Sequence, residues 1–305
     1  MRTASIAEAL QFGSEEHRAG RLAEAEATYR RILLAQPNHA GALHLLGVVA
    51  LQVGRPNVAI DLFRRASALQ PCLCECYSNL GNALQQTGDL EGAAASCRRA
   101  IELNPGFAAA HSNLGNVFSD QKRYDEAIAS FSRAIELDPG FAGAYDNLGN
   151  AFAAVGRFEE AIHAHEVAMC IEPRAAGFHY NLALAFEGNG QAGRAIAAYR
   201  DAIRLDPQRF EAHINLGNAL QNKGRIEEAI DSYRKAKTLR PNDATCANNL
   251  GNALLAAGRN DEAMAAYREA IQFAPNDSVA YSNLANALEA EGSLDEAIEA
   301  CLLAL

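Results

Sequence analysis

The chain has 305 residues, of which 49% are hydrophobic, and a formal net charge of −10 at pH 7. This acidic balance argues against a surface for nucleic acid or for an anionic membrane, because both need clustered Lys and Arg, although a local basic stripe stays open. The seven scattered cysteines favour a reducing compartment, and no stretch approaches the roughly 18 apolar residues of a membrane span, so we expect a cytoplasmic protein.

A proline recurs every 34 residues and defines an internal repeat. With this proline as position 32, the sequence predicts a single array over residues 1–305, with eight complete repeats and a partial ninth. No repeat carries an insertion or a deletion. The repeats span 6–39, 40–73, 74–107, 108–141, 142–175, 176–209, 210–243, 244–277 and 278–305.

Each repeat is predicted to form two short antiparallel helices. The first opens at Ser5-Ile-Ala-Glu8, which has the pattern of a capping box. In repeat 74–107, Tyr77, Leu80, Gly81 and Leu84 follow the i, i+3, i+4, i+7 spacing of a helix face. Glycine at position 15 marks the turn between the two helices, and the proline at position 32 ends the second.

Small and large residues alternate at fixed places in the repeat. Position 20 is Ala in all nine repeats, position 7 is Leu in eight, and position 24 is mostly aromatic. Position 8 is Gly or Ala from the second repeat on. A glycine inside a helix costs roughly 1 kcal/mol relative to Ala, so its regular return predicts close contact between helices.

Leu-Gly at positions 7–8, Ala at 20 and 27, an aromatic at 24 and Pro at 32 together resemble the tetratricopeptide repeat over residues 6–305. The resemblance implies an all-α fold, a right-handed superhelical solenoid of antiparallel helix pairs, with the first helices lining a concave face. Stability is then a sum of contacts between neighbours, and both ends are expected to fray.

The last repeat stops in the apolar run Cys301-Leu-Leu-Ala-Leu305. No polar capping helix follows this run in the sequence. We expect either that the chain is a piece of a longer protein or that this end packs on a partner, which includes self-association through the uncapped C-terminal edge.

Asparagine recurs at two positions that the fold does not need. Position 6 is Asn in seven successive repeats and position 9 in six of the same seven, with Leu184 as the exception. Positions 6 and 9 share one helix face, and in the family this face lines the groove. The predicted peptide-binding residues are Asn79, Asn113, Asn147, Asn181, Asn215, Asn249 and Asn283 at position 6, and Asn82, Asn116, Asn150, Asn218, Asn252 and Asn286 at position 9.

An Asn amide offers a donor and an acceptor, which complement a peptide group, and Asn is a mediocre helix former. Adjacent helices lie ~8–10 Å apart and an extended peptide advances ~3.3 Å per residue, so the row matches a segment of roughly 20 residues. The alternative is that these amides bond to each other or to nearby turns and only stiffen the array. For position 9 both interpretations stay open.

A narrower resemblance rests on Ser78-Asn-Leu-Gly-Asn-Ala-Leu84, Ala110-His-Ser-Asn-Leu-Gly-Asn116 and Tyr281-Ser-Asn-Leu-Ala-Asn-Ala287. These strings are similar to the repeats of O-linked N-acetylglucosamine (O-GlcNAc) transferases, where a repeat arm with Asn at position 6 guides protein substrates to a catalytic domain. The resemblance implies the substrate-recognition arm of such an enzyme. Gln11 and Leu45 hold position 6 in the first two repeats, so the row is expected to begin in the third.

No catalytic, metal or cofactor site is predicted. Cys72-Leu-Cys74-Glu-Cys76 lacks the paired spacing and downstream His of a zinc site, and the His at position 4 (His111, His179 and His213) replaces a Tyr that packs in other repeats. The sequence therefore predicts a scaffold that binds proteins or extended peptides. The alternative is a free-standing adaptor that assembles other proteins, and an enzyme within these residues ranks behind both.

Overall fold

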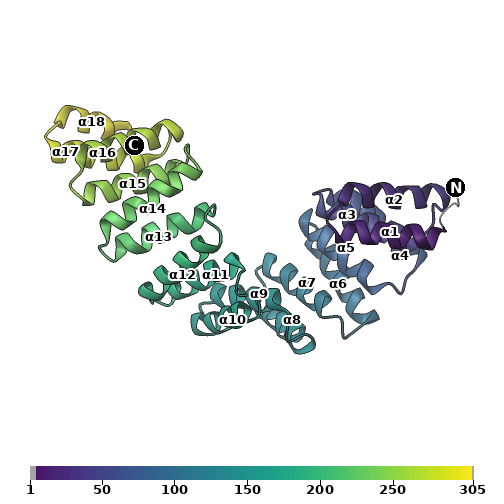
Figure 1. Ribbon diagram of the computed structural model, residues 1–305. Helices are drawn as coiled ribbons and strands as arrows, with labels where there is room; N and C mark the ends of the chain where they lie inside the picture. Colours follow the sequence, from purple (N-terminus) through teal and green to yellow (C-terminus); the bar gives the residue numbers. More distant parts are fainter. Residues whose placement is uncertain (1–4, 304–305) are drawn as a thin grey trace. The chain divides into compact units, whose positions relative to one another are not determined.

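The computed structural model describes residues 5–303, and within that range every regular element is an α-helix, eighteen in all (Figure 1). The all-α prediction is thereby confirmed. Ala304 and Leu305, the last two residues of the C-terminal apolar run, lie outside the described residues. No helix in the described range is both long and apolar enough to cross a membrane.

The helices fall into two compact units, Met1–Val155 and Gly156–Leu305. The first unit contains α1 (Ile6–Arg18), α2 (Leu22–Ala35), α3 (Ala40–Gln52), α4 (Pro56–Leu69), α5 (Cys74–Gln86), α6 (Leu90–Leu103), α7 (Ala108–Asp120), α8 (Tyr124–Leu137) and α9 (Ala142–Ala154). The second contains α10 (Phe158–Ile171), α11 (Ala176–Gly188), α12 (Ala192–Leu205), α13 (Phe210–Asn222), α14 (Ile226–Leu239), α15 (Ala244–Ala256), α16 (Asn260–Phe273), α17 (Ser278–Glu291) and α18 (Leu294–Leu303).

Each repeat supplies one odd-numbered first helix and one even-numbered second helix, as the period predicts. The turn between them adopts the left-handed backbone conformation at position 15, for example at Gly88 with φ of 84°. In the fourth repeat Lys122 takes this conformation without being a glycine, with φ of 60°. The capping box at the start of α1 is present, because the Glu8 amide donates to Ser5 Oγ and the Ser5 amide donates to Glu8 Oε2.

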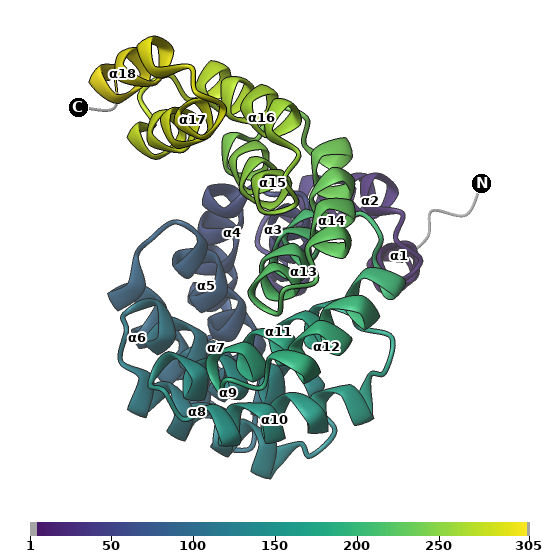
Figure 2. The same ribbon diagram turned by 90° about the vertical axis from the view of Figure 1, so that its left-hand side faces the viewer.

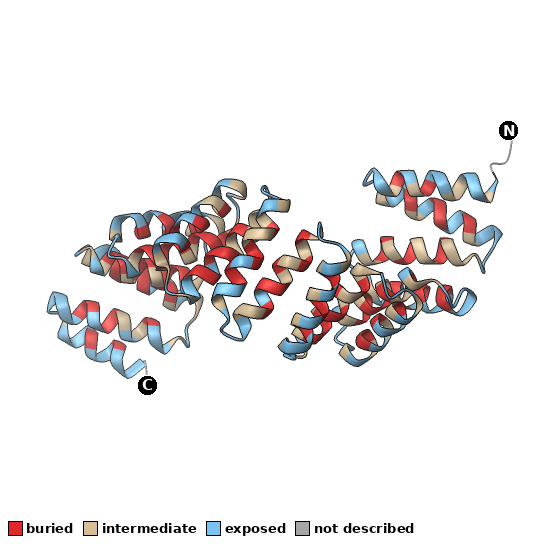
Figure 3. Cartoon of the chain, turned by 90° about the horizontal axis from the view of Figure 1, so that it is seen from below, coloured by how far each residue is buried: buried red, intermediate tan, exposed pale blue. Residues whose placement is uncertain are grey.

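The small residues at positions 8 and 20 allow the two helices of a repeat to pack closely. Ala127 on α8 is fully buried, and so is the Val117 side chain on the facing helix α7. At Gly115 on α7, an added Cβ would lie 2.6 Å from Cε1 of Phe131 on α8, so the ring occupies the space that a side chain would need. Figure 3 shows buried residues along the helix faces that meet inside each unit. The predicted close contact between helices is confirmed.

Within each unit the first helices lie nearer to one another than the second helices do. Backbones of consecutive first helices approach closely between α3, α5, α7 and α9 in the first unit and between α13, α15 and α17 in the second. No comparable approach joins consecutive second helices among the described residues. The first helices therefore form the inner layer of each unit and the second helices the outer layer (Figures 1 and 2).

Candidate functional site

The position-6 asparagines all lie on the inner layer of first helices. Asn79, Asn113 and Asn147 belong to α5, α7 and α9 of the first unit, and the other four belong to α11, α13, α15 and α17 of the second. All seven are half-buried. At position 9, Asn82, Asn116, Asn218 and Asn252 are half-buried, whereas Asn150 and Asn286 are exposed.

The half-buried state of the position-6 side chains follows from bonds to the preceding repeat. In the first unit, Asn79 Nδ2 lies 2.9 Å from His44 Nε2, and Asn113 Nδ2 donates to Ser78 Oγ over 3.0 Å. Asn147 Nδ2 donates to Asn116 Oδ1 over 2.9 Å. Each amide nitrogen therefore ties its first helix to the first helix before it.

The second unit repeats this arrangement. Asn215 Nδ2 donates to the Tyr180 hydroxyl over 3.0 Å, and Asn283 Nδ2 donates to Asn248 Oδ1 over 2.9 Å. Asn249 Nδ2 lies 3.3 Å from Asn218 Oδ1. In these six contacts the acceptor lies at position 5 or position 9 of the preceding repeat, so part of the asparagine row is structural.

The amide oxygens of the same side chains remain available. No described residue donates a hydrogen bond to Oδ1 of Asn79, Asn113, Asn147, Asn215, Asn249 or Asn283. None of these oxygens is among the buried polar atoms without a partner in the described range, so solvent reaches each of them. Because the nitrogen is fixed, the oxygen is held in one orientation, and the inner layer presents a row of uncharged hydrogen-bond acceptors.

Several position-9 side chains are also held by internal bonds. The Tyr233 hydroxyl donates to Asn218 Oδ1 over 2.7 Å, and the Tyr267 hydroxyl donates to Asn252 Oδ1 over 2.8 Å. Burial raises the pKa of Tyr267 to about 12, so this phenol stays protonated and able to donate at neutral pH. These bonds occupy the amide oxygens of Asn218 and Asn252.

Sequence reasoning missed the acceptors that hold the position-6 amides. His44, Ser78, Tyr180 and Asn248 all occupy position 5, but their chemical types differ and give no periodic signal. Their one common property is that each can accept a hydrogen bond. The change from Phe to Tyr at position 24 in the later repeats was a visible signal for the bonds to Asn218 and Asn252.

The position-4 histidines act in the turns between repeats. His179 and His213 are buried, and their Nε2 atoms lie 3.0 and 3.1 Å from the carbonyl oxygens of Pro173 and Pro207. His111 makes the same contact, at 3.1 Å, with the Pro105 carbonyl. These imidazoles are occupied by the turn that starts each repeat, which agrees with their predicted packing role.

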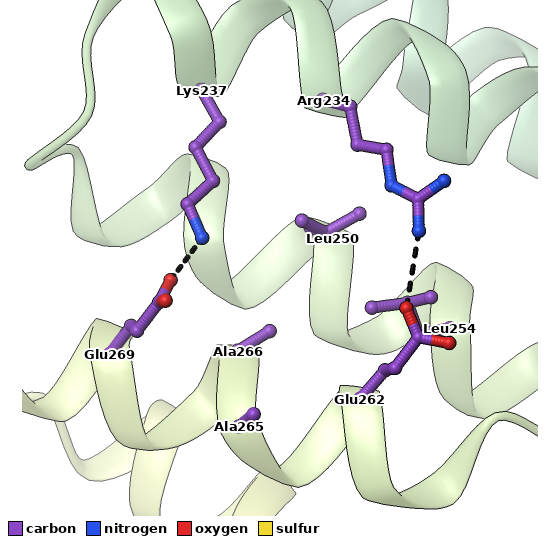
Figure 4. Close-up of a pocket in the computed structure, with 8 residues that line it drawn as sticks. All are labelled: Arg234, Lys237, Leu250, Leu254, Glu262, Ala265, Ala266 and Glu269. Carbon is purple, nitrogen blue, oxygen red and sulfur yellow. Dashed lines mark hydrogen bonds and ion pairs between the residues drawn. The ribbon is translucent and has the colours of Figure 1, made fainter.

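A small cavity of about 250 Å³ lies on the outer layer between α14 and α16, over Leu250 of α15 (Figure 4). Lys237 pairs with Glu269 on one side of it, and Arg234 Nη2 lies 3.1 Å from Glu262 Oε2 on the other. All four charged groups are paired across the cavity. The cavity is therefore a gap between two second helices that ion pairs bridge, and it offers no free acid or base.

Comparisons with known proteins agree with this fold. Residues 107–305 match the family model of the Cilia and flagella-associated protein 70 C-terminal domain, and residues 10–71 and 74–107 match models of the tetratricopeptide repeat. No curated protein matches the sequence.

Among the solved structures that resemble the chain are YrrB, MamA and the complex Cut9–Hcn1. YrrB, titled a TPR protein with an unusual peptide-binding site, is 25% identical, with a TM-score of 0.54 over 65% of this chain and 99% of its own. MamA is 30% identical, with a TM-score of 0.47 over 54% of this chain and 96% of its own. The APC/C hetero-tetramer Cut9–Hcn1 is 18% identical, with a TM-score of 0.65 over 88% of this chain and 52% of that one, and this likeness concerns the fold alone.

Proposed function

The chain belongs to the tetratricopeptide-repeat family of the Cilia and flagella-associated protein 70 C-terminal domain, and arrays of this kind are protein-interaction scaffolds. We propose that it binds extended polypeptide segments along the asparagine row of its first helices. The observation that carries the proposal is the set of six position-6 Oδ1 atoms that solvent reaches and that no described residue uses. An extended peptide offers the complementary donors in its backbone N–H groups.

The spacing of the helices suits such a ligand. Packed helices lie ~8–10 Å apart and an extended chain advances ~3.3 Å per residue, so one repeat corresponds to about three ligand residues. The three asparagine-bearing first helices of the first unit then accommodate about nine residues, and the four of the second unit about twelve. Recognition of the backbone makes binding tolerant of ligand sequence, because every residue except proline carries the same N–H group.

The likeness to YrrB supports a peptide ligand. YrrB is described as having an unusual peptide-binding site, and nearly all of its chain matches part of this one. The uncharged character of the row also favours a backbone-directed mode over capture of an acidic tail, which needs Lys or Arg on the same face. The position-6 row carries no charged side chain in either unit.

The test is a binding titration with a fluorescein-labelled twelve-residue peptide of alternating Ser and Thr. We expect the double variant Asn215→Ala, Asn249→Ala to bind this peptide about tenfold more weakly than the unaltered chain, because two charge-free hydrogen bonds of ~0.5–1.5 kcal/mol each are lost. The matched control is Asn222→Ala, an exposed asparagine at the end of α13 outside the row. Equal affinities for all three proteins, with unchanged far-UV circular dichroism, would rule the proposal out.

We further propose that the chain is the substrate-recognition arm of an O-GlcNAc-transferase-like protein. The seven successive asparagines at position 6 and the strings around them favour it, since that family places Asn at this position. Co-purification of an O-GlcNAc-transferase catalytic domain with the native protein is the expected observation. Native material of 32.6 kDa that carries no such activity would argue against this setting.

The alternative is a free-standing cytoplasmic adaptor that pairs with a second copy. Leu294, Ile298 and Leu302 on α18 are 60%, 59% and 66% exposed, and apolar side chains clustered on one helix favour association. Light scattering after size-exclusion chromatography measures the molar mass of the chain in solution and so distinguishes a monomer from a pair of copies. A dimer that Ile298→Glu converts to a monomer would support the adaptor.

A further inference from the structure

One repeat interrupts the asparagine row with an apolar side chain. Position 9 of repeat 176–209 is Leu184, whereas the other six repeats from the third on carry Asn there. Leu184 is 40% exposed on α11. Among the described first helices from α3 to α15, no other exposes a large apolar side chain to this extent.

An aromatic ring lies on the same face of α11, one turn earlier. Tyr180 and Leu184 are separated by four residues, which places their side chains next to each other on the helix. Tyr180 is half-buried, and its hydroxyl accepts the amide N–H of Asn215 over 3.0 Å. Together Leu184 and Tyr180 form what we call the Leu184 patch.

The ring in this patch is held from two further directions. The guanidinium carbon of Arg209 lies 5.1 Å from the centre of the Tyr180 ring, and the Tyr199 ring centre lies 5.9 Å away. Contacts on several sides restrict the ring to one orientation. The aromatic half of the patch is therefore held in place by the protein's own contacts.

The patch continues the proposed binding row. Asn215 both belongs to the row and fixes Tyr180, so the apolar patch and the next amide acceptor are joined by one hydrogen bond. Beyond it, the row extends over α13, α15 and α17 of the same unit. An apolar side chain at the start of three amide-bearing helices fits a ligand that has one apolar anchor beside a stretch recognised through its backbone.

We propose that the Leu184 patch is a subsite for one large apolar side chain of the extended peptide. This inference rests on the proposed function and adds a register to it. At about three ligand residues per repeat, the anchor lies next to a stretch of about nine residues along α13, α15 and α17. A row that recognises only backbone N–H groups lets a peptide slide, whereas a single buried side chain fixes its position.

The experiment compares two fluorescein-labelled peptides of nineteen residues, one alternating Ser and Thr with Leu at its centre and one with Ala at that place, so that about nine residues follow the anchor in either direction. The unaltered chain is expected to bind the Leu peptide about tenfold more tightly, because burial of the longer apolar side chain is favourable. Leu184→Asn is expected to bind both peptides equally. This variant introduces the residue that six other repeats carry at position 9, so we expect its fold to be preserved.

Val58→Asn is the matched control, since Val58 is an exposed apolar residue on the second helix α4. It should keep the tenfold preference. A Leu184→Asn protein that still prefers the Leu peptide would overturn the subsite while leaving backbone recognition intact, and Leu184→Ala provides a second reading of the same point. A roughly tenfold loss of affinity for both peptides in Asn215→Ala, Asn249→Ala would support the row. An unaltered chain that binds neither peptide would overturn both proposals.

Discussion

At the scale of single residues, the two polar atoms of the position-6 asparagine amide have different surroundings. In Asn113 the nitrogen donates to Ser78 Oγ of the preceding repeat, while the oxygen has no donor among the described residues. A side chain with only an acceptor would lose the first contact, and one with only a donor would lose the second. Asparagine keeps both groups, so the proposed role of the oxygen and the observed bond of the nitrogen are compatible with one residue type at this position.

The two ends can be separated by the substitution Asn113→Asp. A carboxylate keeps an acceptor in place of the amide oxygen but has no N–H to donate to Ser78, so we expect the free energy of unfolding to fall by about 1 kcal/mol. Affinity for the Ser–Thr peptide should change little by comparison. Urea unfolding and the peptide titration measure the two effects.

Asn104→Asp is the control for that variant. Asn104 Oδ1 accepts the Gly106 amide over 3.1 Å, and Asp138 makes the equivalent bond to Gly140 in the next repeat. This substitution should therefore leave stability unchanged. If Asn113→Asp proved equally neutral, the bond to Ser78 would contribute nothing to the junction between repeats.

Lys122 offers a second test at this scale. It adopts φ of 60° at position 15, where eight other repeats carry glycine with φ between 72° and 84°. The left-handed conformation costs an L-residue roughly 1 kcal/mol, so Lys122→Gly is expected to stabilise the chain by up to about that amount. Lys223→Gly, at a position with φ of −92°, should stabilise nothing. A lower thermal midpoint for Lys122→Gly than for the unaltered chain would contradict the explanation.

At the scale of elements, the second helices are linked by a recurring ion pair. Arg at position 25 pairs with Glu at position 19 of the next repeat, as in Arg200–Glu228 at 2.6 Å and Arg234–Glu262 at 3.1 Å. Each glutamate also accepts from an arginine three residues before it. Hydrogen bonds from the Arg225 and Arg259 guanidinium groups are the largest cause that holds the pKa values of Glu228 and Glu262 below the ordinary value of 4.5.

These lowered pKa values predict how stability depends on pH. A carboxyl whose pKa is lower in the folded than in the unfolded chain stabilises the fold at pH values above its unfolded pKa. This stabilisation is lost as the pH falls through the folded pKa. The urea concentration at the unfolding midpoint should therefore decrease as the pH is lowered below 4.5. The double variant Glu228→Gln, Glu262→Gln should show a smaller decrease. Glu291→Gln, at an exposed residue without an ion-pair partner in the described range, should keep the original slope. An unchanged slope in the double variant would show that the pairs do not stabilise the fold.

The elements themselves were predictable because their signals are local and repeat. Gly88 in the turn, the Gly115–Phe131 contact and the Ser5–Glu8 cap each depend on residues within one helix pair, so the sequence pattern specified them. The bonds from Asn147 to Asn116 and from Asn249 to Asn218 agree with the alternative that the amides bond to each other. The position-5 partners were not predictable, since His44 and Tyr180 can both accept a hydrogen bond but share no residue type. The division at Val155–Gly156 was also hidden, because the 34-residue period runs through it without a change.

At the scale of the whole molecule, stability depends on neighbours. Within each unit, helices contact the helix before and after them and, on the inner layer, neighbouring first helices. The helices that pack on each other in the described range are therefore at most two helices apart along the chain. A chain of this kind behaves as a one-dimensional series in which each repeat is stabilised by its own packing and by two interfaces. Damage to one repeat should then weaken its neighbours and leave distant repeats intact.

Gly47→Val tests this. An added Cβ at Gly47 would lie 2.7 Å from Cε1 of the buried Phe63, so a valine should force the helices α3 and α4 apart at a cost of roughly 1–3 kcal/mol. Hydrogen exchange should accelerate in α3, α4 and the adjoining repeats, while α13 to α16 in the second unit keep their protection. Gly251→Val, beside the Tyr267 ring, is the reciprocal variant and should reverse the pattern. Uniform acceleration over all helices in both variants would instead mean that the repeats unfold as one cooperative body, because only a shared transition transmits a local overlap to helices that have no contact with it.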